Sequence, residues 1–435
     1  MEESRKTEQV MLLQSLKRLI VSFVCCLPLS LLGLLLMFLL IYNSFSVFSL
    51  HLDPIPPKST LPLNYNHQFL HHHPSLSTSS SKSDSSLLLA VKETSLGFVQ
   101  KQNVSPEKIE RRTRRHKRRN QLTPEMTRKP QGKSRHVFKT RIKSFLSKSS
   151  CESLFFMIWI SSIESFGHRE RFTVESLFKS HPNSCLILVS NSLDCQRGTL
   201  ILKPFTDKGL KVLSIKPDFT YIFKDTSAEK WFERLKKGMF SPGVIPLEQN
   251  LSNLLRLVLL YKFGGIYLDT DVIILKPLTN LHNVIGAQTV DQVTRKWSRL
   301  NNAVLIFDKN HPLLKSFINE FSRTFNGNKW GHNGPYLVSR VVARFNVSSS
   351  DLGFSVLPPS SFYPVDWTRI SRFYRASVSE REAKWSRKRL MHLRKHSLAV
   401  HLWNRESRKL RVEEGSIIQK LMYDSCIFCN SSFLH

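Results

Sequence analysis

One segment, residues 254–275, constrains the fold more than any other part of the chain. It runs from an apolar helix through a Gly-Gly pair into a short strand and then into an Asp-Thr-Asp motif. Its leucines and Val258 recur at helical spacing. Asn250 or Ser252 can cap the helix, and Gly264 stands where a left-handed residue commonly ends one. The segment therefore predicts the order helix, turn, strand, acidic pair.

The acidic pair, Asp269 and Asp271, lies directly after the strand. Side chains alternate in an extended segment, so both carboxylates are expected on one side and Thr270 on the other. Paired carboxylate oxygens suit Mg²⁺ or Mn²⁺ carrying phosphates. Open α/β sheets bind ligands beyond the carboxyl ends of their strands, so the pair is expected at a ligand-binding edge. A lone Asp-x-Asp is common in solvated turns, and the flanking helix and strand carry this interpretation.

The wider pattern predicts an α/β fold. Buried strands are predicted at 154–160, 185–190 and 210–215, with a helix at 169–180 and a helix or turn at 198–205 between them. This alternation is typical of a mostly parallel sheet with helices on both faces. A loop-rich section at 216–249, a strand at 302–308, helices at 311–324 and after the Gly-Pro break, and late strands at 356–359 and 398–403 complete the prediction.

The acidic motif and three later segments resemble a known enzyme family. The matching residues are Arg256, Gly264, Gly265, Tyr267, Asp269 and Asp271, followed by SRLNNAVLIFDKNHPLL, WGHNGPYLVSR and AVHLWN. On these residues, positions 151–435 resemble the α1,4-glycosyltransferases, including plant members and relatives such as globotriaosylceramide synthase and α1,4-N-acetylglucosaminyltransferase. The resemblance implies a single catalytic domain with the GT-A fold, the Rossmann-like fold of nucleotide-diphospho-sugar transferases.

The same resemblance implies an activity. The expected reaction is metal-dependent transfer of a hexose, galactose or N-acetylglucosamine, from a UDP-sugar to a glycan or glycolipid, with retention at the anomeric carbon and an α1,4 linkage. Asp271 and His401 are expected to ligate Mn²⁺ or Mg²⁺, and Asp269 to contact the ion, the ribose or a metal-bound water. A structural histidine is the alternative for His401. No carboxylate stands out as a covalent nucleophile, which favours front-face attack.

Further residues are assigned to the donor by the resemblance. Arg256 is expected to contact the sugar or diphosphate, with a helix-surface salt bridge as the alternative, and Gly265 and Tyr267 belong to the same donor-binding region. Asn253 stands where related enzymes commonly carry an aspartate that binds sugar hydroxyls. An amide keeps the hydrogen-bonding capacity and loses the charge. This departure leaves the donor sugar open and allows a catalytically silent sugar-binding or scaffold protein as the alternative function.

The WGHNGP segment adds catalytic candidates. His332 and Asn333 stand beside a Gly-Pro turn, and turns present polar side chains toward clefts. Trp330 either stacks on a sugar or belongs to the core. Trp403 follows His401 on the same face of an extended segment and is expected to line the acceptor groove.

The N-terminal third has a different character. Residues 19–42 carry no charge and are long enough to cross a bilayer, and basic residues precede them. We therefore predict a cytosolic tail at 1–18, a signal anchor at 19–42, a flexible basic stem at 43–150 and a catalytic domain at 151–435. The expected location is the Golgi membrane, with type II topology and a luminal catalytic domain.

Positive charge and cysteines bear on partners. The chain has a net charge of +31, and the basic run at 111–119 has the composition of a nucleic-acid patch. The predicted anchor and the lack of a recognition module argue against nucleic acid as a partner.

A luminal location permits disulfides. A local bridge between Cys426 and Cys429, or one between Cys185 and Cys195, is expected, with the pairing left open.

Overall fold

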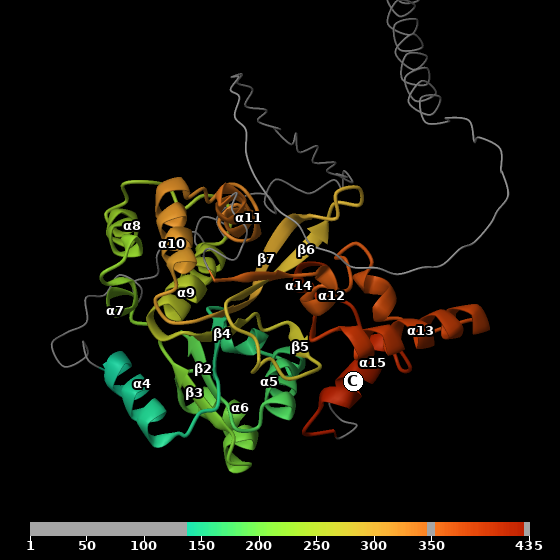
Figure 1. Cartoon of the computed structure of the whole chain (residues 1–435). Coiled ribbons are helices and arrows are strands. Elements are labelled where there is room, and N and C mark those ends of the chain that lie inside the picture. Colours follow the sequence, from blue (N-terminus) through green and yellow to red (C-terminus); the bar gives the residue numbers. More distant parts are fainter. Residues whose placement is uncertain (1–136, 346–352, 430–435) are drawn as a thin grey trace, which may run out of the picture. The chain divides into compact units, whose positions relative to one another are not determined.

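The computed structural model describes residues 137–345 and 353–429, which belong to a compact unit formed by residues 98–435 (Figure 1). The chain's other unit, residues 1–97, lies outside the described residues, as do the predicted membrane span and the basic run at 111–119. Within the described ranges, no helix is both long and apolar enough to cross a membrane.

A mixed seven-stranded sheet forms the centre of the fold, in the spatial order β3-β2-β1-β4-β7-β6-β8. Its strands are β1 Leu154–Trp159, β2 Cys185–Ser190, β3 Lys211–Ile215, β4 Gly265–Leu268, β6 Val284–Val290, β7 Trp297–Phe307 and β8 Ser355–Leu357. The first four run parallel, while β7 is antiparallel to both β4 and β6. The predicted α/β class and mostly parallel sheet are confirmed.

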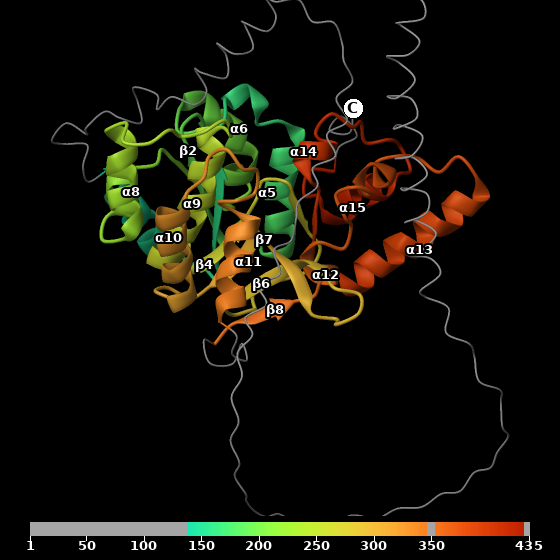
Figure 2. The same cartoon turned by 90° about the horizontal axis from the view of Figure 1, so that it is seen from above.

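Helices cover both faces of the sheet (Figure 2). Along β1, Phe156 and Ile158 face one core, whereas Phe155 and Met157 face the other, as the alternation of a strand requires. One face carries α7 Phe219–Phe223, α8 Ser227–Lys236, α9 Leu247–Phe263, α10 Pro312–Thr324 and α11 Pro335–Arg344. The other face carries α5 His168–Ser180 and α6 Gln196–Asp207. The sheet therefore lies between two apolar layers.

A C-terminal subregion holds a second, two-stranded sheet. Strand β5 Val272–Ile274 pairs antiparallel with β9 Ala399–His401. The late strand predicted at 398–403 thus forms away from the main sheet, whereas β8 does form that sheet's edge. Around the pair lie α12 Pro359–Phe362, η4 Ile370–Phe373, α13 Glu380–His396, α14 Asn404–Ser407 and α15 Ile417–Ser425. The short helix η2 Ile163–Ser165 precedes α5.

Helix α4, Val137–Lys148, precedes the boundary that the sequence suggested at residue 151. Its Phe138 and Ile142, one turn apart, are buried in the core beneath α9. Arg141 donates two hydrogen bonds to the Asp194 carboxylate, at 2.7 and 2.9 Å. The packed part of the chain therefore includes residues that we assigned to the stem.

Two local predictions were wrong. The section at 216–249 contains α7 and α8, and α8 buries Ala228, Trp231, Phe232 and Leu235, which do recur at helical spacing. Helix α9 begins at Leu247 after Pro246, so neither Asn250 nor Ser252 caps it. Proline at this point already fixes the backbone for the helix start.

The described cysteines form two disulfides, Cys151–Cys185 and Cys426–Cys429, and Cys195 is free and exposed. The local C-terminal bridge is confirmed, and the bridge between Cys185 and Cys195 was wrong. The parallel register of β1 and β2 explains the difference, because the Cys185 N–H donates to the Ser153 carbonyl at 2.9 Å and so lies beside the chain near Cys151.

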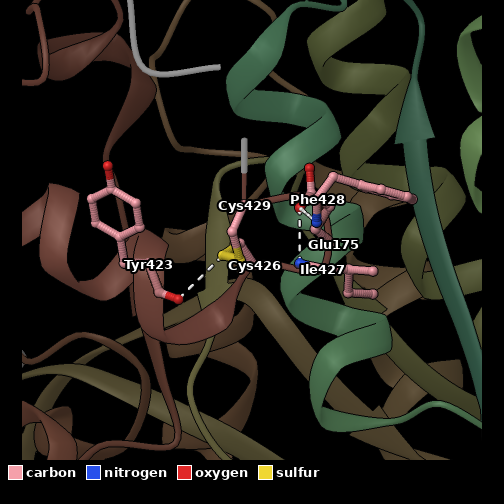
Figure 3. Close-up of a disulfide and its surroundings, with 6 residues drawn as sticks. All are labelled: Glu175, Tyr423, Cys426, Ile427, Phe428 and Cys429. Atoms are coloured by element: carbon pink, nitrogen blue, oxygen red, sulfur yellow. Dashed lines mark hydrogen bonds between the residues drawn. A yellow bond between two sulfur atoms is a disulfide. The ribbon is translucent and has the colours of Figure 1, made fainter. Parts of the chain in front are cut away.

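The C-terminal disulfide closes a short loop over α5 (Figure 3). The Glu175 carboxylate accepts the N–H groups of Ile427 and Phe428, each at 3.1 Å. Phe428 also packs edge-on against Phe205 of α6, with ring centroids 5.4 Å apart. The end of the described chain is thus held on the helices of the second face.

Two glycines turn the chain from α9 into β4. Gly264 ends the helix with φ of 71°, which confirms its predicted position. Gly265 has φ of 108°, and a Cβ there would lie 2.3 Å from the Leu154 carbonyl oxygen. Gly265 therefore lets β4 approach β1 closely, at the end of the strand opposite to Asp269.

We expect Gly265→Ala to lower the free energy of unfolding by about 3 kcal/mol or more, because backbone strain and a collision with β1 add together. Gly209→Ala is the matched control. Gly209 also has positive φ, at 76°, but nothing lies within 4 Å of an added Cβ, so its loss should be about 1 kcal/mol. Chemical denaturation measures both, and equal losses would contradict the proposed close approach.

Candidate metal centre

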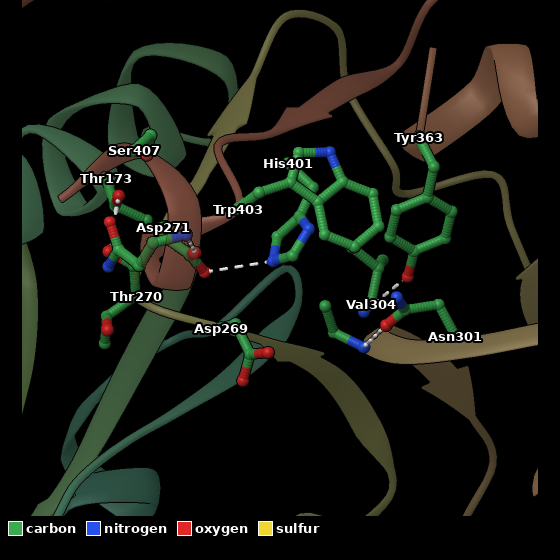
Figure 4. A network of polar contacts seen from close by, with 12 residues as sticks. Thr173, Asp269, Thr270, Asp271, Asn301, Val304, Tyr363, His401, Trp403 and Ser407 are labelled. Atoms are coloured by element: carbon green, nitrogen blue, oxygen red, sulfur yellow. Dashed lines mark hydrogen bonds and ion pairs between the residues drawn. The ribbon is translucent and has the colours of Figure 1, made fainter. Parts of the chain in front are cut away.

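The acidic motif forms a turn between β4 and β5 (Figure 4). The Asp269 N–H donates to the Ala303 carbonyl at 2.8 Å, and the Thr270 carbonyl accepts from the Thr173 hydroxyl at 2.9 Å. We expected alternation along one extended segment, and this was wrong because the chain turns at the end of β4. The turn still brings both carboxylates to the same place.

His401 completes a cluster with the two aspartates. One ligand atom from each of Asp269, Asp271 and His401 lies within 4.8 Å of the others. The pairing of β9 with β5 sets Val272 opposite His401, and so carries the imidazole to the acidic turn. Asp271 and His401 are buried, whereas the Asp269 side chain is 28% exposed. The structure therefore brings together the three residues predicted to hold a metal.

Asp271 is held by the end of β9 and the residues that follow it. His401 Nε2 lies 3.2 Å from Asp271 Oδ1, and the Asn404 N–H donates to Oδ2 at 2.8 Å. Burial opposes the charge on Asp271, but the facing imidazole outweighs it and lowers the pKa of the carboxyl. Burial likewise acts to lower the pKa of His401, and Asp271 outweighs it and raises that pKa. The two groups stabilise each other's charged form.

Asp269 is held by a separate pair of side chains. Arg256 Nη2 lies 3.0 Å from Asp269 Oδ1, which also accepts the Tyr267 hydroxyl at 2.6 Å. Arg256 is 4% exposed, and its guanidinium lies 4.4 Å from the Tyr267 ring centroid and donates to the Asn302 carbonyl at 2.8 Å. The salt bridge that was the alternative for Arg256 is present, but the arginine is buried and pairs with Asp269 instead of lying on the helix surface.

Asn253 joins this network one helical turn before Arg256. Its Oδ1 accepts from Asn302 Nδ2 at 2.9 Å, and the residue is 8% exposed. A Cβ at Gly334 would lie 2.8 Å from Asn253 Oδ1, so the loop before α11 approaches this amide closely. Asn302 was not predicted as a site residue, although it stands in a matching segment, and it links Asn253 to Arg256 through its side chain and carbonyl.

His332 and Asn333 make structural contacts away from the acidic cluster. Asn333 is 2% exposed, and its amide donates to Asn250 Oδ1 and the Asn326 carbonyl, each at 2.9 Å. His332 Nε2 lies 2.8 Å from the Thr324 carbonyl, and burial lowers the pKa of the imidazole. Both residues hold the loop before α11 in place. Neither belongs to the cluster of Asp269, Asp271 and His401, although both were predicted to be catalytic.

Tyr363 and Asn404 also adjoin the site, and neither was predicted as a site residue. The Tyr363 hydroxyl accepts from the Val304 N–H at 3.2 Å, and its ring lies 5.9 Å from that of His401. Burial raises the pKa of Tyr363. Asn404 stands at the end of AVHLWN, so its place in a matching segment was the available signal.

The residues present fit a divalent cation. Two carboxylates and one imidazole suit Mn²⁺ and related ions. One atom beside the cluster, Asn404 Oδ1, is buried without a hydrogen-bond partner among the described residues. Buried polar atoms are ordinarily satisfied. An unsatisfied buried atom is expected where an ion with its waters completes the hydrogen-bond network.

Two family profiles match the chain across this site. Residues 167–291 match the glycosyltransferase sugar-binding region containing the DXD motif, and residues 306–433 match the alpha 1,4-glycosyltransferase conserved region. The first range includes Asp269 and Asp271, and the second includes His401. The profiles and the cluster together define a protein of the DXD glycosyltransferase class.

Three relatives narrow this class. An uncharacterised protein of Arabidopsis thaliana is 31% identical over 301 residues, 67% of this chain and 45% of that protein. Lactosylceramide 4-alpha-galactosyltransferase of Gorilla gorilla gorilla is 32% identical over 259 residues, 56% and 72% of the two chains. Alpha-1,4-N-acetylglucosaminyltransferase of Homo sapiens is 26% identical over 220 residues, 48% and 58%. The chain belongs to the alpha 1,4-glycosyltransferase family, as the sequence predicted.

The matches cover the relatives unequally. The chain spans about half the length of the Arabidopsis protein and more of the other two. Among solved structures, an active-site mutant of LgtC has a TM-score of 0.35 and 11% identity, covering 64% of this chain and 98% of that one. This likeness is too slight to support an argument, so the GT-A assignment stays a prediction.

Behind the His332 loop lies a buried carboxylate, Glu320 of α10. It forms ion pairs with Arg340 and Arg344, each at 2.7 Å, and Arg340 also donates to the His332 carbonyl at 2.8 Å. The hydrogen bond from Arg344 lowers the pKa of Glu320 from 4.5 to about 2. Burial opposes this shift, and Arg340 adds to it. The two ion pairs of Glu320 therefore join α10 to α11.

A carboxyl whose pKa falls on folding adds stability above its unfolded pKa and loses it as pH drops toward the folded value. We expect Glu320→Gln to lower the free energy of unfolding at pH 7 by about 2 kcal/mol, and to flatten its decline between pH 4.5 and about 2. Glu164→Gln, which breaks an exposed pair with Arg197, should change little. Urea titrations at a series of pH values measure the free energy of unfolding. An equally steep decline below pH 4.5 in wild type and Glu320→Gln would contradict the prediction.

Proposed function

We propose that the chain is a retaining, metal-dependent glycosyltransferase that moves galactose or N-acetylglucosamine from a UDP-sugar to a glycan or glycolipid. The observation that carries the proposal is the cluster of Asp269, Asp271 and His401 at the end of β4. Family membership supports the same reading. The linkage expected from the family is α1,4.

The two aspartates are proposed to have different tasks. Asp271 and His401 would hold Mn²⁺ or Mg²⁺, which when bound neutralises charge on the departing diphosphate. Arg256 and Tyr267 both bind Oδ1 of Asp269. They leave Oδ2 to accept a ribose hydroxyl or a metal-bound water. An imidazole in the ligand set favours Mn²⁺ over Mg²⁺.

Retention is proposed to proceed by front-face attack. Glu170 is buried, and burial raises the pKa of its carboxyl, but its Oε2 accepts the Gly167 N–H at 2.9 Å. That carboxylate caps α5 and has no evident task as a covalent nucleophile. The protein would then act by positioning the two substrates and by electrostatic stabilisation. A glycosyl adduct trapped on a carboxylate would refute this mechanism.

The acceptor site is proposed to lie near Trp330. Trp330 is 44% exposed, so the core alternative is wrong, and the Arg405 guanidinium lies 4.3 Å from its ring centroid. An exposed aromatic ring suits stacking on a sugar. The names of the relatives support a glycan or glycolipid acceptor.

We further propose a Golgi location with type II topology. The apolar segment at 19–42 and the basic residues before it support this. The disulfides Cys151–Cys185 and Cys426–Cys429 are typical of oxidising secretory compartments.

The test uses the full chain in detergent with a panel of nucleotide sugars, with and without Mn²⁺. Asp271→Asn should reduce metal-dependent nucleotide release by about 100-fold or more, because the ion supplies several kcal/mol of charge stabilisation. Asp207→Asn, which changes an exposed carboxylate paired with Lys203, should retain full activity.

Two outcomes would count against the proposal. Equal nucleotide release by wild type and Asp271→Asn would exclude the proposed metal site. Donor binding without turnover on every acceptor tried would favour a silent sugar-binding protein, the alternative that Asn253 allows.

A further inference from the structure

Trp403, between β9 and α14, has a backbone conformation that its residue type disfavours. Its φ of 55° and ψ of 59° lie in the left-handed region. A bulky residue there is a genuine outlier, and such outliers cluster where a site requires a particular chain path. The position is two residues after His401.

The left-handed turn brings two amides onto one aspartate. The Leu402 N–H donates to the Asp271 carbonyl at 2.8 Å, and the Asn404 N–H donates to Asp271 Oδ2, also at 2.8 Å. An extended Trp403 would carry the second amide about 7 Å beyond the first. Both acceptors belong to a single residue, so the chain must turn back at Trp403.

The indole of Trp403 also covers the imidazole of His401 (Figure 4). The ring centroids lie 4.2 Å apart at 73°, and the indole N–H donates to the Val365 carbonyl at 2.8 Å. Tyr363 lies about equally far from both rings, at 5.9 Å from His401 and 6.0 Å from Trp403. Three aromatic side chains thus pack together at this point.

His401 lacks the contact that ordinarily orients a metal-binding histidine. Such residues usually donate their second ring nitrogen to a carboxylate, carbonyl or water. His401 Nδ1 is buried and has no hydrogen-bond partner within the described ranges. Its ring orientation therefore depends on the neighbouring aromatic rings and on Asp271.

We propose that Trp403 is a positioning residue for the metal site, which turns the chain onto Asp271 and fixes the His401 ring in place of a hydrogen bond. It acts through these two residues and does not touch the ion. The role differs from the acceptor contact expected from the sequence. It rests on the proposed metal-dependent function.

The test is calorimetric titration of the full chain with Mn²⁺ alone, without any donor. Trp403→Gly keeps the left-handed turn, since glycine adopts positive φ freely, but removes the ring, and should weaken Mn²⁺ binding about tenfold or more. Trp403→Phe restores an aromatic ring and should recover most of the affinity. Trp403→Leu fills the space without a ring, and should bind as weakly as Trp403→Gly.

Trp367→Gly, at a tryptophan that is 45% exposed, is the matched control and should bind Mn²⁺ like wild type. Melting temperatures identify any variant that fails to fold, and Trp403→Leu then replaces Trp403→Gly. Wild-type affinity in Trp403→Leu or Trp403→Gly would overturn the proposal. So would a Trp403→Phe variant as weak as Trp403→Leu.

Asp271→Asn in the same titration separates this proposal from the function on which it rests. Unchanged Mn²⁺ binding in Asp271→Asn would refute the metal site itself. Lost binding in Asp271→Asn together with unchanged binding in Trp403→Gly would refute the role of Trp403 alone.

Discussion

A buried carboxylate, Asp271, holds the two parts of the site together. It belongs to the turn after β4, yet its partners come from the end of β9 and the residues that follow it, namely His401, Leu402 and Asn404. A buried charge is tolerated where paired and hydrogen-bonded groups compensate it. The profile that includes Asp271 ends at residue 291, and the profile that includes His401 begins at residue 306. The Asp271 contacts thus unite in space what the family shares as separate stretches of sequence.

The neighbouring carboxylate, Asp269, has a contrasting environment. Arg256 and Tyr267 fix one of its oxygens, while its side chain remains 28% exposed. Asn302 extends this network to Asn253 of α9, because it donates to the Asn253 side chain and accepts from Arg256. One aspartate is buried among groups that suit an ion, and the other is oriented toward solvent. Two chemically identical side chains thus have different surroundings, as their different proposed roles require.

Local patterns in the sequence predicted the parts of the fold that depend on neighbouring residues. The end of α9 at Gly264 and the first three strands follow from helical spacing, apolar runs and glycine's tolerance of positive φ. Contacts between distant segments were harder. The pairing of β5 with β9 placed His401 as expected, but the sequence carried no sign of Tyr363 beside it or of the Cys151–Cys185 bridge. Asn333 was predicted to be catalytic because it stands in a turn. The sequence does not distinguish an asparagine that contacts a substrate from one that, as here, donates to Asn250.

The most direct test of this account is anomalous diffraction from crystals of the protein grown with Mn²⁺ and UDP. The account predicts a manganese peak coordinated by Asp271 and His401, with Asp269 on the ion, its waters or the ribose, and with the UDP diphosphate also bound to the ion. UDP bound at the end of β4 with no manganese there, or manganese bound by other residues, would contradict it.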